Sequence, residues 1–165
     1  MKSGAKRRCL NIKLMKPLFF FALSFFLLNN LNAQFVAKVE VKEPIQGLCS
    51  SKDVYTLLPM FGDQKEAVCP ASDEEITKRL DSAVVFLKDH PNFKDKGMVG
   101  IWINCKGEVV KCKMDNKTKD ATLDSQIVAV FRELGKWEAG KLNGKPVDTL
   151  RLFSFEIKKG KISVN

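Results

Sequence analysis

Hydrophobic and polar positions between Ser72 and Pro91 follow the period of a helix. Apolar side chains recur at steps of three and four residues and form one stripe: Ile76, Leu80, Ala83, Val84 and Leu87. Ser72 and Glu75 form a capping-box pair at the start, and Pro91 disfavours helical geometry at His90. The pattern predicts one amphipathic helix that starts at Ser72 and ends at His90.

The next segment has a period of two and predicts a β-hairpin. Its first strand alternates three apolar residues, Val99, Ile101 and Ile103, with Gly100, Trp102 and Asn104. Residues 104–107 offer a type I turn with Gly107 in the left-handed position, and residues 108–114 return. Because the return strand does not alternate cleanly, we expect a β-bulge near Val110.

A second helix and a final strand follow. The apolar face of the helix consists of Leu123, Ile127, Val130, Phe131 and Leu134. We expect Thr122 as its N-cap and Gly135 as its terminator. The final strand spans 147–157, with one face made by Phe153, Phe155 and Ile157. Leu150 and Leu152 fall out of step, which predicts a second bulge.

Five residues have predicted structural roles: Gly107, Trp137, Gly140, Asn143 and Gly144. Asn143-Gly144 forms a turn before the final strand. Trp137 follows the second helix, and we expect it to anchor that helix to the sheet rather than to serve as a ligand platform.

The element order from residue 72 is helix, strand, strand, helix, strand. It predicts an α+β fold: a two-layer domain with a three-stranded antiparallel sheet and two helices on one face, over residues 72–165. Residues 34–71 form an N-terminal extension packed on this domain, with one short strand within 35–41.

The first 33 residues have the order of regions found in a secretory signal peptide. A lysine- and arginine-rich start without acids precedes an apolar run over 17–28, and a small residue, Ala33, precedes the expected cleavage site. Met15 is an alternative start. An uncleaved anchor is the competing interpretation, but the apolar run is shorter than the roughly 20 residues of a spanning helix.

Removal of this segment changes the charge of the chain. Of 28 Lys and Arg residues six lie within residues 1–33, which leaves 22 against 19 acids and a net charge of +3. Nucleic-acid binding requires a concentrated basic face, so we expect no nucleic-acid partner.

Four cysteines remain after cleavage: Cys49, Cys69, Cys105 and Cys112. An even count in an exported chain favours disulfides, and three connectivities are open. If Asn104 pairs with Glu108, Cys112 lies opposite Gly100, and Cys105 is roughly 13 Å from Cys112. In that register Cys105 and Cys112 bond to Cys49 and Cys69, or stay reduced.

No residue set favours a metal, a cofactor or catalysis. Cys-x-x-Cys and His-x-x-x-His spacings are absent, and His90 is the only histidine. We expect a chain that is not an enzyme, and a solvated helix-end position for His90.

Residues 97–157 resemble the C-terminal domain of TonB, the periplasmic energy transducer of Gram-negative bacteria. The motifs are Val99-Gly-Ile-Trp-Ile, Lys106-Gly107, Leu123-Asp124, Trp137-Glu-Ala-Gly-Lys, Asn143-Gly-Lys-Pro-Val147 and Phe153/Phe155. Pro59-Met-Phe-Gly62 is loosely similar to a segment that precedes the first helix in relatives. The apolar N-terminal run is short, and no proline-rich spacer follows, so the resemblance implies a soluble periplasmic module.

The resemblance also implies a partner and a binding mode. An outer-membrane TonB-dependent receptor, or another envelope protein, would add a segment as a strand to the exposed sheet edge in transmembrane transport. The matching edge is the last strand, with partner-binding residues Leu150, Arg151, Leu152, Phe153, Ser154 and Phe155. A homodimer through that edge is a further candidate. The alternative function is a secreted structural or small-ligand-binding protein without a receptor partner.

Overall fold

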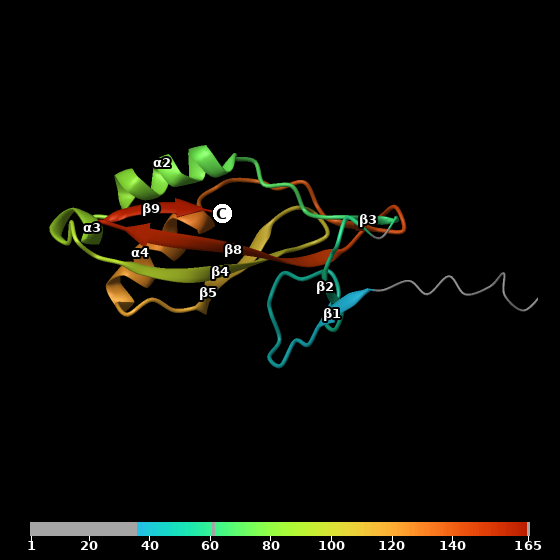
Figure 1. Cartoon of the computed structure of the whole chain (residues 1–165). Helices are drawn as coiled ribbons and strands as arrows, with labels where there is room; N and C mark the ends of the chain where they lie inside the picture. Colours follow the sequence, from blue (N-terminus) through green and yellow to red (C-terminus); the bar gives the residue numbers. More distant parts are fainter. Residues whose placement is uncertain (1–35, 61, 165) are drawn as a thin grey trace, which may run out of the picture. The chain divides into compact units, whose positions relative to one another are not determined.

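A mixed six-stranded sheet organises the computed structural model, which describes residues 36–60 and 62–164 (Figure 1). The strand order is β1-β2-β8-β4-β5, and β9 also pairs with β8. The strands are β1 (Ala37–Val39), β2 (Val54–Thr56), β4 (Asp95–Ile103), β5 (Val109–Asn116), β8 (Asp148–Lys158) and β9 (Lys161–Val164). A separate three-stranded sheet joins β3 (Gln64–Lys65), β6 (Lys141–Leu142) and β7 (Lys145–Pro146).

The prediction of a three-stranded antiparallel sheet is therefore wrong. Its three strands are present as β5, β4 and β8, but β1, β2 and β9 extend the sheet, and β2 runs parallel to β8. β1 lies within residues 35–41, where a short strand was predicted. β2 and β9 are only three and four residues long, so their own sequence pattern is weak. β9 returns through a tight turn at Lys159 (φ 52°) and Gly160 (φ 69°), which is the geometry of a two-residue hairpin.

Within residues 36–60 and 62–164, three short helices replace the two that were predicted: α2 (Asp73–Ala83), α3 (Phe86–Asp89) and α4 (Ala121–Arg132). The single helix expected between Ser72 and His90 is interrupted after Ala83. At the interruption Phe86 N–H donates to the side chain of Gln126 (3.0 Å), and the Ser82 carbonyl accepts from Lys88 Nζ (3.2 Å). These two groups would otherwise bond to each other in a continuous helix.

The helix starts combine a confirmed prediction with a correction. Ser72 is the N-cap of α2, and its hydroxyl accepts from Glu75 N–H (3.3 Å). The N-cap of α4 is Asp120 instead of Thr122, because the Asp120 carboxylate accepts from the N–H groups of Thr122 and Leu123.

The main core lies between α2, α4 and the sheet face that they cover, here called the helix face. Its fully buried side chains include Ile76, Leu80, Ile101, Ile103, Leu123, Ile127, Phe131 and Phe155. Trp137 is also buried there and packs edge-on against Phe153, with ring centroids 5.8 Å apart.

A second cluster covers part of the opposite sheet face, here called the far face. Trp102, Leu150 and Val54 are buried under apolar side chains of the N-terminal segment: Val39, Val41, Ile45 and Leu48. Leu150 and Leu152 are thus out of step with Phe153 because they belong to the far face. The bulge predicted in β8 is wrong, since β8 pairs with β4 without interruption from Thr149 to Ile157.

The bulge predicted near Val110 is confirmed. Trp102 pairs with Lys111 and Ile103 pairs with Val109, so Val110 is the extra residue. The observed register places Cys112 opposite Ile101, one residue from the expected Gly100.

The turn residues lie where the chain changes direction. Gly107 (φ 80°) closes the hairpin turn, and a Cβ atom there would lie 2.0 Å from the Trp137 carbonyl oxygen. Asn143 and Gly144 connect β6 to β7, and Gly140 packs against Thr149.

The predicted signal peptide, residues 1–33, lies outside the described residues. Among the residues that the structure describes, no helix is long and apolar enough to cross a membrane.

Candidate interaction surface

The closing strand β8, predicted to be the binding edge, lies inside the sheet. Its start pairs with β2 at Asp148 and Thr149, and its end pairs with β9 from Phe155 onward. The expectation of a free edge is wrong at both ends, since β2 and β9 occupy the side opposite β4. On that side no described strand pairs with Leu150–Phe153, so strand addition by a partner stays a prediction for this short stretch only.

Side chains in this stretch are largely engaged within the molecule. Phe153 packs against Phe131 and Trp137 on the helix face, with centroids 5.4 Å and 5.8 Å away. Arg151 forms an ion pair with Glu66. Leu152, which is 43% exposed, offers the largest apolar surface of the predicted set. A partner segment that added here could contact one exposed apolar side chain, Leu152, and the short unpaired backbone of Leu150–Phe153.

Two other margins of the sheet offer little room. The outer side of β9 faces α2, where Val164 N–H donates to the Thr77 hydroxyl (3.3 Å). The strand β1 has only three residues, which limits the ladder that a partner could form.

The longest open margin in the described chain is the outer side of β5. This strand has eight residues and pairs with β4 on one side, and no described strand pairs with the other. Asn104 N–H donates to the Glu108 carbonyl (2.9 Å), which fixes the orientation of backbone groups in the hairpin. Because these groups alternate along a strand and Val110 is bulged, Cys112 and Met114 direct their N–H and C=O groups outward.

A groove of about 650 Å³ runs between β5 and α4 along this margin. We call it the edge groove. Its lining combines the apolar or small residues Cys112, Met114, Ala121, Ser125 and Val128 with the polar residues Lys113, Lys117, Thr118, Lys119 and Asp124. The groove lies on the helix face, so alternate side chains of an added strand would enter it.

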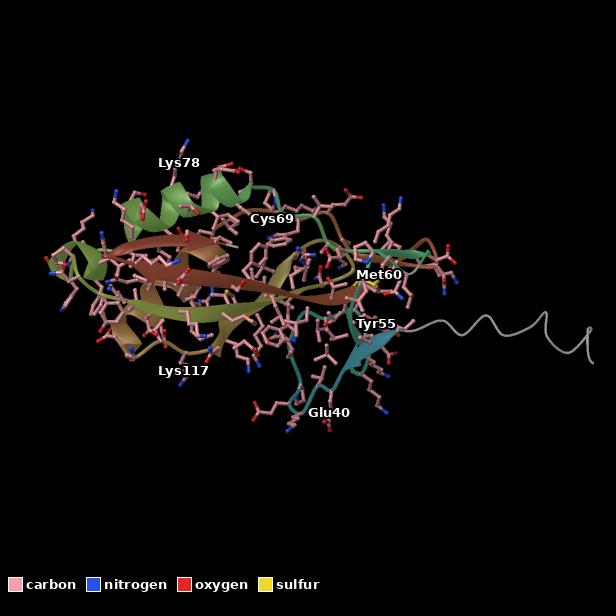
Figure 2. All side chains as sticks on the ribbon, viewed as in Figure 1. Glu40, Tyr55, Met60, Cys69, Lys78 and Lys117 are labelled. Atoms are coloured by element: carbon pink, nitrogen blue, oxygen red, sulfur yellow. A yellow bond between two sulfur atoms is a disulfide. The ribbon has the colours of Figure 1, made fainter. Side chains whose placement is uncertain are left out.

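The far face of β5 carries positive charge. Lys111 and Lys113 place their ammonium groups 5.5 Å and 5.4 Å from the Trp102 ring centroid, a favourable cation–π geometry. Lys117 and Lys119 follow in the loop after β5. Figure 2 shows Lys117 below β5, and Lys78 of α2 beyond the opposite margin of the sheet. Within the described residues, these four β5-side lysines have no carboxylate within ion-pair distance.

A disulfide joins Cys49 to Cys105, which is one of the pairings left open by the sequence. Asp148 lies beside it, and the two sulfur atoms and its carboxylate are within 4.8 Å of one another. Such a set of donors has the composition of a metal site. However, the bonded sulfurs are not thiolates, and the carboxylate already accepts from the N–H groups of Ser50 and Cys105. The group is therefore a covalent and hydrogen-bonded connection between the N-terminal segment and the hairpin turn.

The other two cysteines among the described residues, Cys69 and Cys112, are free thiols in environments that disfavour ionisation. Burial raises the pKa of Cys112 to about 11, and burial also raises the pKa of Cys69. The thiolate is the nucleophile in thiol chemistry, so both groups are poorly reactive near neutral pH.

We expect a thiol titration of the mature chain to show the low reactivity of Cys69 and Cys112 directly. Two thiols should react with a disulfide reagent in denaturant, and both should react slowly in the folded protein at neutral pH. The rate should rise with pH, because a raised pKa delays formation of the thiolate. One fast-reacting thiol in the folded protein would contradict this expectation and favour a catalytic role.

His90 is the C-cap of α3 and stacks on Phe86, with ring centroids 4.1 Å apart. Its Nδ1 is 2.8 Å from the Phe86 carbonyl oxygen, a distance for Nδ1–H donation. The ring is exposed at the end of a helix, as expected from the sequence.

Comparison of the chain with protein-family models, curated proteins and solved structures finds no match. The resemblance to the TonB C-terminal domain thus stays a prediction.

Proposed function

We propose that this chain is a non-catalytic interaction domain that binds an extended segment of an envelope protein by strand addition at the outer side of β5. In strand addition the backbone of the guest completes a hydrogen-bond ladder, and pockets for alternate side chains provide selectivity. The observation that carries the proposal is an eight-residue strand with one side open, bordered by the edge groove.

A TonB-dependent outer-membrane receptor is the partner that the sequence resemblance favours. Export to the periplasm is part of the proposal and is supported by the order of regions in residues 1–33. The Cys49–Cys105 disulfide agrees with an oxidising compartment.

Site-specific photo-crosslinking tests both the edge and the partner. A photoreactive residue at Met114 should crosslink the mature chain to a receptor in envelope extracts, whereas one at Lys78 on α2 should not. Crosslinking from Leu152 instead of Met114 would place strand addition at the open stretch of β8 and contradict the β5 site. Consistent absence of a receptor would favour the structural or ligand-binding alternative.

A proline at the same position tests the backbone ladder. Met114→Pro removes an N–H group that points away from β4, so the fold should tolerate it better than a proline at Lys113. Met114→Val is the matched control because it changes the side chain and keeps the N–H group. Receptor crosslinking from a neighbouring position should be lost in Met114→Pro and retained in Met114→Val, with circular dichroism confirming that both variants fold.

A further inference from the structure

We infer that the β5 margin selects an extended segment in which acidic and apolar residues alternate. This inference rests on the proposed function, since it concerns the chemistry of the guest at that same edge. Side chains of an added strand alternate between the helix face and the far face, in step with the residues of β5. The two faces of β5 differ in chemistry, so they impose different requirements on odd and even positions of the guest.

The helix-face positions require apolar side chains. Cys112 is 6% exposed, and Met114 and Val128 pack against the main core from the side of the edge groove. Two lining residues from α4, Ala121 and Ser125, are small and exposed, so the groove has room beside them. A guest aliphatic group placed here would remove apolar surface of both partners from water.

The far-face positions require acids. Lys111 and Lys113 are directly successive on this face of β5, and both ammonium groups stay near the Trp102 ring. A carboxylate on the adjacent guest strand would lie within cross-strand distance of one or both. Three acids line the same hollow as Lys111 and Lys113: Asp115 of β5, and Glu40 and Glu43 of the N-terminal segment. In the part of the chain that the structure describes, none of their carboxylates lies within ion-pair distance of either lysine, so both ammonium groups stay available to a guest carboxylate.

A second copy of this chain is a poor occupant of the same edge. Antiparallel pairing of β5 with β5 would bring Lys111 and Lys113 of one copy beside those of the other, and like charges facing each other across a strand pair are destabilising. Lysines on an edge strand are a common defence against such pairing. The positive face therefore disfavours self-association and favours an acidic guest.

Labelled synthetic peptides of about eight residues, matching β5 in length, test this inference by fluorescence anisotropy. One peptide alternates glutamate and valine, the second has the same composition in two blocks, and the third alternates lysine and valine. The folded mature chain should bind the first peptide, with roughly tenfold weaker binding of the other two. Affinity should fall as salt increases, because the far-face contacts are exposed charges.

Charge reversal on β5 supplies the decisive comparison. Lys111→Glu/Lys113→Glu should lower the affinity for the acidic peptide roughly tenfold or more and raise the affinity for the lysine–valine peptide. Lys65→Glu/Lys78→Glu makes the same change in net charge at other sites and should leave both affinities unchanged. Met114→Pro should abolish binding of every peptide.

The outcomes separate this inference from the proposed function. If Met114→Pro abolishes binding but charge reversal has no effect, strand addition stands and the acidic preference is wrong. If the alternating acidic peptide does not bind at all, the inference fails, whereas receptor crosslinking at Met114 would still support the function. Sedimentation that shows a dimer disrupted by Met114→Pro would identify a second copy as the occupant and overturn the inference.

Discussion

Replacing both Cys49 and Cys105 by serine is expected to lower the free energy of unfolding by about 4 kcal/mol. The disulfide spans 56 residues of sequence, and a closed loop of that length removes much of the conformational freedom of the unfolded chain. The bridge also holds the N-terminal segment over the far face, where Trp102 and Leu150 are buried. Loss of the disulfide therefore acts mainly by increasing the conformational freedom of the unfolded chain, and to a smaller extent by loosening the segment that covers Trp102.

Urea unfolding of the double variant, with the oxidised parent protein beside it, measures the effect. Adding a reductant to the parent should produce a similar loss. Cys69→Ser is the matched control, because this half-buried thiol takes no part in the bridge and its replacement should change stability by less than about 1 kcal/mol. Equal stability of oxidised and reduced parent protein would show that the loop contributes nothing.

Asp148→Ala is expected to lower the free energy of unfolding by about 4 kcal/mol, because two partly buried N–H groups lose their hydrogen bonds to a charged acceptor. The Asp148 carboxylate is in a residue only 2% exposed, and its two oxygens accept from Ser50 N–H (2.7 Å) and Cys105 N–H (2.8 Å). Each bond joins β8 to a residue that flanks or belongs to the disulfide. One side chain thus connects the N-terminal segment, the hairpin turn and the start of β8.

Thermal and urea unfolding of Asp148→Ala and Asp148→Asn test this role. Asparagine keeps one acceptor oxygen, so Asp148→Asn should lower the free energy of unfolding by roughly half as much as Asp148→Ala. Asp81→Ala, an exposed acid on α2, is the control and should be nearly neutral. A loss for Asp148→Ala no greater than that of Asp81→Ala would refute the role. Combining Asp148→Ala with the double serine variant should give a non-additive loss, since both act on the same connection.

Local patterns were sufficient for the elements whose partners are close in sequence. The hairpin of β4 and β5, its bulge at Val110 and the helix α4 were predicted because each depends on neighbouring residues. The strands β2 and β9 were missed because three or four residues carry little pattern of their own. Leu150 and Leu152 were misinterpreted because the segment that makes the far face a second buried surface comes from residues 39–48.

The candidate site shows the same division. The alternation of Lys111 and Lys113 with Cys112 and Met114 was present in the sequence. The closing strand was chosen instead because of the resemblance to the TonB family. Its pairing with β2 and β9 depends on contacts between distant segments, which no local pattern contains. Asp148 was missed for a similar reason, since its importance depends on Ser50 and Cys105.

The parallel pairing of β2 with β8 has a consequence for the order of folding in a chain that is synthesised from its N-terminus. Val54 and Tyr55 find their partners, Asp148 and Thr149, about ninety residues later. Until those residues are synthesised, β2 cannot pair with β8. During that interval Cys69 is closer to Cys49 in sequence than Cys105 is, so a Cys49–Cys69 disulfide could form first. A chaperone or a disulfide isomerase that protects this interval would raise the yield of correctly bridged protein, while leaving the stability of the finished molecule unchanged.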